Sequence, residues 1–183
     1  MGKQKEKKFL EGSEWENFRG EFCNADDRSC ALLGAAYICN CLEILILELF
    51  AHKDVAKKTL IRGMNPLATF SAKTKITFCA NIIPKEIYDD INLIRKIRNK
   101  FAHELHGINF NTSPVKDWAN ELKFPTRYIG TTGEHTVESV LKNDPRLKFE
   151  FTCSVMSGVI SDYYLERTKK IKNFIEQIDS DCS

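Results

Sequence analysis

An arginine, an amide and a histidine stand close together near the middle of the chain, as Arg98, Asn99 and His103. The guanidinium of arginine binds phosphate or carboxylate through a planar fork of N–H donors. Histidine exchanges a proton close to neutral pH. The three residues could therefore cleave a phosphodiester without a metal ion. His103 would move the proton, and Arg98 would stabilise the charge that develops on the phosphorus oxygens.

The same residue types also occur in polar clusters that hold helices together. Asn99 and His103 are four residues apart and share one helix face, whereas Arg98 lies at the seam between the polar and apolar faces. A guanidinium at such a seam would pair with a carboxylate, because buried polar groups need partners. Both interpretations stay open. The residues expected in a structural cluster are Asp27, Arg28, Glu43, Arg98 and His103.

Apolar side chains predict the helix that would position these residues. They recur every three or four residues from Ile87 to Leu105, so one face of this helix belongs to the core. Pro84 suits the first turn of the helix, and Gly107 is expected to end it. The candidate site would then lie on the polar side of a long amphipathic helix.

A second apolar segment, 27–50, predicts a buried central helix, because it is apolar on nearly every side. Asp26 or Asp27 would cap its start. Its internal Asn40 and Glu43 make it a poor membrane span, so no membrane is expected. Further helices are predicted over 13–22, 54–61, 72–83 with Ser71 as the cap, 114–122, 137–141 and 145–178.

The predicted fold is therefore all-α, a single helical domain of about seven helices over 13–183, preceded by a basic flexible arm at 1–12. The linker before the fourth predicted helix carries polar side chains that could line a groove at a helix N-terminus, where anions bind favourably. The basic run near Arg98 supplies a further phosphate contact. The candidate binding residues are Asn65, Thr69, Ser71, Lys73 and Arg95.

Composition excludes several functional classes. The net charge is only +2, from 27 basic and 25 acidic residues, and the chain has no helix-turn-helix pattern, so any DNA contact is expected to be weak or indirect. Seven cysteines without a CxxC spacing predict a reducing, cytoplasmic location. His103 and His106 are too few ligands for a metal, and no nucleotide-binding loop is present, so neither a metal nor another cofactor is expected.

Three blocks of the sequence stand out, Asp27 to Ala36, Asn65 to Ile76 and Ile94 to His103. Together they resemble the mannitol-operon repressor family, and the resemblance covers about residues 24–122. It implies an all-helical, non-enzymatic transcriptional regulator of a sugar-alcohol operon. Because family members lack an evident helix-turn-helix, repression would run through a protein partner, a regulator or a phosphotransfer-type protein.

The spacing of Arg98, Asn99 and His103 is also similar to the RNxxxH signature of HEPN domains. These domains are all-α, usually homodimeric, and include metal-independent ribonucleases. This resemblance implies RNA as the substrate and the same three residues as the catalytic set, repeated across a two-fold axis. It is the alternative to the repressor interpretation.

Overall fold

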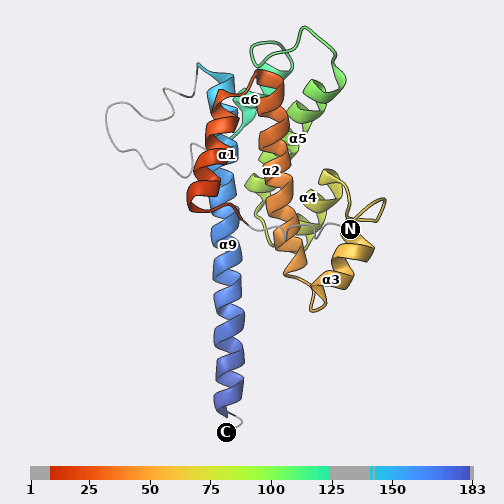
Figure 1. Cartoon of the computed structure of the whole chain (residues 1–183), viewed down its shortest axis with the longest axis vertical. Helices are drawn as coiled ribbons and strands as arrows, with labels where there is room; N and C mark the ends of the chain where they lie inside the picture. Colours follow the sequence, from red (N-terminus) through yellow and green to blue (C-terminus); the bar gives the residue numbers. More distant parts are fainter. Residues whose placement is uncertain (1–8, 124–140, 142, 182–183) are drawn as a thin grey trace, which may run out of the picture.

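A computed structural model describes residues 9–123, 141 and 143–181 of the chain, with side chains as far as Tyr164. The described part consists of seven α-helices and one π-helical segment and contains no strand, which confirms the all-α prediction (Figure 1). The elements are α1 Gly12–Asn24, α2 Asp27–Leu47, α3 Lys53–Ala56, a π-helix Lys57–Ile61, α4 Phe70–Cys79, α5 Lys85–His103, α6 Val115–Glu121 and α9 Pro145–Asp181.

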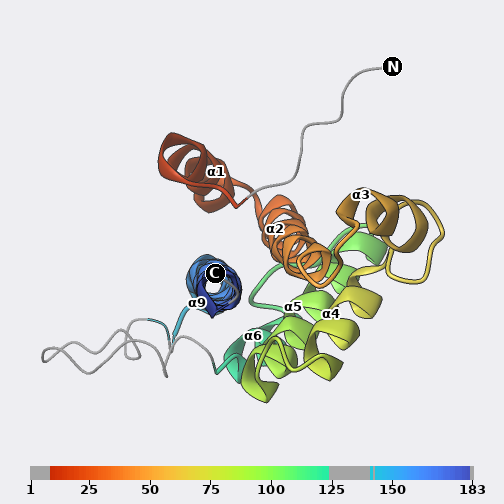
Figure 2. The same cartoon turned by 90° about the horizontal axis from the view of Figure 1, so that it is seen from below.

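Helix α2 lies at the centre of the bundle and contacts α1, α4, α5 and α9 (Figure 2). It begins where predicted, because the Asp26 carboxylate accepts hydrogen bonds from the backbone N–H groups of Arg28 and Ser29 at 2.9 and 3.1 Å. By length and composition α2 could cross a membrane, yet 67% of its most apolar window is buried inside the protein. Such burial is what the core helix of a bundle shows.

Gly34 lets α1 and α9 approach α2 closely. A Cβ atom on Gly34 would lie 3.0 Å from the rings of Phe22 and Phe149 and 3.1 Å from the Sγ atom of Cys153. Phe149 also continues a row of rings from α9 through Phe110 to Phe101, with centroids 5.2 and 5.1 Å apart. The close approach at Gly34 therefore packs α1 and α9 against α2, and the row of rings joins α9 to α5.

Several predicted boundaries need correction. Ser71 does not cap α4; the Oγ1 atom of Thr69 accepts from the backbone N–H of Ala72 at 3.1 Å, so the helix begins at Phe70. Helix α5 ends at His103 instead of running on toward Gly107, because the next residue has extended ψ. Helix α1 begins at Gly12, after Glu11 instead of after Ser13, and α2 ends at Leu47.

The arm predicted at 1–12 is described only from residue 9 onward, and that part is folded. Phe9 is 8% exposed, and its ring packs against the ring of Tyr164 with centroids 5.2 Å apart. Residues 1–8 lie outside the described residues, as does nearly all of the helix predicted at 137–141. A single domain over 13–183 stays a prediction.

Buried thiols predict a loss of stability at alkaline pH. Burial of Cys41 raises the pKa of its thiol from about 9 to about 12. The unfolded chain then loses this proton near pH 9 while the folded chain keeps it, so stability is present below pH 9 and falls as pH rises toward 12. Urea unfolding at pH 8, 9, 10 and 11 would measure this effect. We expect this thiol to lower the free energy of unfolding by up to about 1 kcal/mol per pH unit.

Two cysteine variants separate this effect from general alkaline damage. Cys41→Ala should unfold more easily at every pH, because it leaves a small cavity, but with a shallower dependence on pH. Cys79→Ala changes an exposed thiol and should leave the dependence as it is in the parent. Equal slopes for the parent and Cys41→Ala would contradict the assignment.

Candidate functional site

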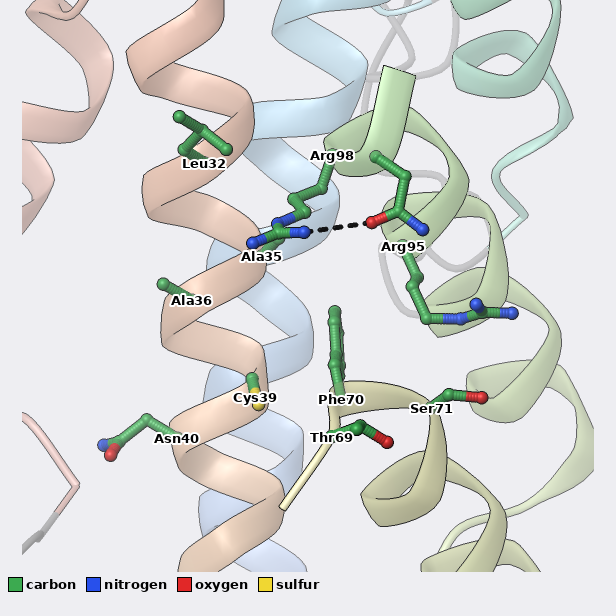
Figure 3. Close-up of a pocket in the computed structure, with 11 residues that line it drawn as sticks. Leu32, Ala35, Ala36, Cys39, Asn40, Thr69, Phe70, Ser71, Arg95 and Arg98 are labelled. Carbon is green, nitrogen blue, oxygen red and sulfur yellow. Dashed lines mark hydrogen bonds between the residues drawn. The ribbon is translucent and has the colours of Figure 1, made fainter. Parts of the chain in front are cut away.

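A pocket of about 750 Å³ lies between α2, the start of α4 and α5 (Figure 3). Three of the predicted binding residues and two of the predicted catalytic residues line it together. The α2 wall consists of Leu32, Ala35, Ala36, Cys39 and Asn40; the start of α4 gives Thr69, Phe70 and Ser71; and α5 gives Arg95, Arg98 and Asn99.

The first turn of α4 forms one side of the pocket. Because the Thr69 side chain is committed to the N–H of Ala72, it caps only one of the free donors at this helix end. The backbone N–H groups of Phe70 and Ser71 lie in the first turn, where the helix offers no carbonyl to accept a hydrogen bond from them. They stand at the positive end of the helix dipole, which favours an anion.

Two arginines on α5 form the opposite side. Arg98 is exposed, extends from α5 toward α2 in Figure 3, and donates from Nη1 to Oδ1 of Asn99 at 3.1 Å. Arg95 donates from Nη2 to Asn92 at 3.3 Å, while its Nε atom is buried without a hydrogen-bond partner among the described residues. The lining residues, all of them described, include these two cations and no carboxylate. The pocket is therefore suited to a negatively charged group.

The predicted catalytic set is only partly assembled. Arg98 and Asn99 touch each other and line the pocket, but His103 is an exposed residue at the last position of α5 and does not line it. Within one chain, the described geometry places no histidine where it could serve a phosphodiester held by Arg98. Nothing in the described residues favours the ribonuclease interpretation.

The predicted structural cluster is divided among separate contacts. Glu43 pairs with Lys73 at 2.6 Å, not with Arg98, and both side chains are buried. Lys73 was expected to line the groove; instead it joins α4 to α2, with its Nζ atom 4.0 Å from Sγ of Cys39. Asn65 is also outside the pocket, because its amide donates to the carbonyl of Lys58 at 2.7 Å.

Arg28 and Asp27 fasten the start of α2 to distant parts of the chain. The Arg28 guanidinium donates to the carbonyls of Phe101, Glu104 and Leu105, the last two at 2.6 and 3.2 Å, and so satisfies the end of α5. Asp27 accepts from the backbone N–H of Phe110 at 3.0 Å. These two members of the expected cluster hold the fold and are not part of the pocket.

Arg146 is a central residue that the sequence analysis missed. Its Nη1 atom lies 2.6 Å from Asp27, its Nε atom 2.8 Å from Glu150, and its Nη2 atom 2.5 Å from the carbonyl of Ala25. It thereby ties the start of α9 to the junction of α1 and α2. The spacing of Arg146 and Glu150, four residues apart on a helix, was the available signal.

Comparison with known proteins gives the family. The sequence model of the mannitol repressor family matches residues 26–144. The X-ray structure of the MtlR–HPr complex from Escherichia coli is similar in fold, with a TM-score of 0.63 and 16% sequence identity, over 80% of this chain and 98% of the matched chain. No match was found among curated proteins. Because the family match spans well over half of its length, the chain belongs to the mannitol repressor family, as the three sequence blocks predicted.

Proposed function

We propose that this member of the mannitol repressor family controls transcription through contact with a phosphotransfer protein of the HPr type. The observation that carries the proposal is that the similar structure was solved as a complex of MtlR with HPr. Of the matched chain in that complex, 98% aligns with this chain. The mode of action would then be protein binding, and the target a sugar-alcohol operon.

The charge balance supports a protein partner over direct binding to DNA. Affinity for the DNA backbone comes mainly from basic residues that neutralise phosphates. This chain has 27 basic and 25 acidic residues, so its net charge of +2 gives little general attraction to DNA. A partner protein can supply what the chain lacks for action at an operator.

A cytoplasmic location and a homodimer belong to the same proposal. None of the described cysteines forms a disulfide, and three of them are buried, which fits a compartment that keeps thiols reduced. Size-exclusion chromatography with light scattering would give the oligomeric state of the purified chain. A mass equal to one chain at all concentrations would remove the homodimer from the proposal.

Binding to the HPr-type protein of the same organism is the direct test. We expect isothermal titration calorimetry to show a saturable complex at roughly micromolar concentrations, the usual range for regulatory contacts. In cells, a reporter driven by the sugar-alcohol promoter should be repressed when both proteins are present and released when the gene for either is deleted.

An unrelated promoter in the same strains serves as the control and should respond to neither deletion. Specific binding of the purified chain alone to the operator, with repression unchanged in the strain that lacks the HPr-type protein, would contradict a partner-dependent mechanism. Absence of a complex at roughly 100 µM of each protein would contradict it as well, because a micromolar Kd would saturate binding at that concentration.

A further inference from the structure

The pocket between α2, α4 and α5 gathers positive charge and hydrogen-bond donors from two directions. Figure 3 shows Arg98 on the α5 side, with Phe70 and Ser71 at the start of α4 across from it. We infer that this pocket is a binding site for a small organic phosphate, a phosphate monoester that carries a hydroxylated carbon chain. The inference rests on this geometry alone and does not depend on the proposed function.

The donors are available to a ligand. Arg98 is exposed and donates to its chain neighbour Asn99 from Nη1, so the other N–H groups of its guanidinium can bind an anion. Arg95 also lines the pocket, but Figure 3 shows its side chain extending from α5 away from α2, so Arg98 is the cation that faces α2.

A phosphate suits this arrangement better than a carboxylate does. A carboxylate is planar, and a single arginine fork can satisfy both of its oxygens from one side. A phosphate monoester presents three oxygens around a tetrahedral centre, so it can accept from the arginine on α5 and from the amide donors of α4 at the same time. Helix α4 is ten residues long, and its N-terminal turn forms part of the wall.

The size and lining of the pocket indicate more than inorganic phosphate. A volume of about 750 Å³ falls in the range of sites for small organic molecules. Beyond the arginines the wall offers the side-chain amide of Asn99, which can hydrogen-bond a hydroxyl group, and an apolar surface at Leu32 and Phe70. A short hydroxylated chain attached to the phosphate would contact both kinds of surface.

Titration at constant ionic strength tests the inference. The purified full chain would be titrated by calorimetry with glycerol 3-phosphate and with glucose 6-phosphate, and in parallel with uncharged glucose. We expect saturable binding of at least one phosphate ester and none of glucose. Arg98→Gln should weaken the binding by about tenfold or more, because it removes a charge-assisted contact to the phosphate.

Lys96→Gln is the matched control, because it removes a positive charge from the same helix at an exposed position whose ammonium lies over the Trp118 ring, 5.9 Å from its centroid. The affinity of the Lys96→Gln variant for the phosphate ester should equal that of the parent protein. Thermal unfolding would verify that each variant is folded; if Arg98→Gln is not, Arg98→Lys keeps the charge, loses the fork and should still bind more weakly. Equal affinity in the parent and the folded arginine variant, equal binding of glucose, or no binding of either ester at about 10 mM would overturn the inference.

Discussion

Replacing Lys73 by methionine should lower the free energy of unfolding by about 3–5 kcal/mol. The side chains of Lys73 and Glu43 are only 6% and 5% exposed, and their charged atoms lie 2.6 Å apart between α4 and α2. Without the ammonium, the Glu43 carboxylate stays inside the bundle with its nearest positive charge removed. Urea unfolding at pH 7, followed by circular dichroism, would measure the loss.

A second substitution identifies the cause of the loss. Lys73→Met combined with Glu43→Leu removes both charges and should recover most of the stability, because an apolar pair of similar volume avoids burying either ion. Lys85→Met is the matched control, since Lys85 pairs with Asp89 at 2.8 Å on the surface with 71% of its side chain exposed. That variant should lose much less stability than Lys73→Met, because water screens an exposed ion pair. A similar loss in Lys73→Met and Lys85→Met would contradict the role given to the buried pair.

The helices that form the bundle were predictable from short-range patterns. The apolar segment after Asp26 gave α2 and its cap, and the three-to-four spacing from Ile87 onward gave α5, because both signals act within a few turns of the same helix. The start of α4 was harder to place. Ser71 is the better capping residue by type and Thr69 is also suitable, and the path of the linker, which Asn65 closes onto Lys58, decides between them.

The pairing of charges could not be read from the sequence in the same way. Glu43 was expected near Arg98, but its partner is Lys73, 30 residues away on another helix. Any of several basic side chains could have met this carboxylate, and only the packing of α4 against α2 selects one. Composition and periodicity predict which face of its own helix a residue lies on. They do not predict which other helix packs against that face.

The pocket shows both sides of this limit. Its polar residues Thr69, Ser71 and Arg95 were predicted as anion contacts because a helix N-terminus and a basic run have local signatures. The wall from α2 was not predicted, because small side chains such as Ala35 and Ala36 are as compatible with close helix packing as with a pocket. In the structure Gly34 makes the close approach to α9, whereas Ala36 is exposed and leaves room for the pocket.

Replacing Arg146 by methionine is expected to cost about 2–4 kcal/mol of unfolding free energy. The guanidinium contacts Asp27, Glu150 and the carbonyl of Ala25 at 2.5–2.8 Å, so its loss affects three segments together. Glu150 is the most buried of the acids involved, with 11% of its side chain exposed, and it would lose the cation beside it. Amide hydrogen exchange should show the effect locally, as faster exchange in the first turns of α2 and α9.

The geometry of the guanidinium, and not only its charge, should account for most of this cost. Arg146→Lys keeps the positive charge, but a single ammonium cannot reach acceptors on α2, on α9 and on the linker between α1 and α2, so it should recover less than about half of the loss. Arg62→Met, the same substitution at an exposed arginine, should change stability by no more than about 0.5 kcal/mol. Full recovery with lysine would show that charge alone holds α9 at this junction and would contradict the forked arrangement as its cause.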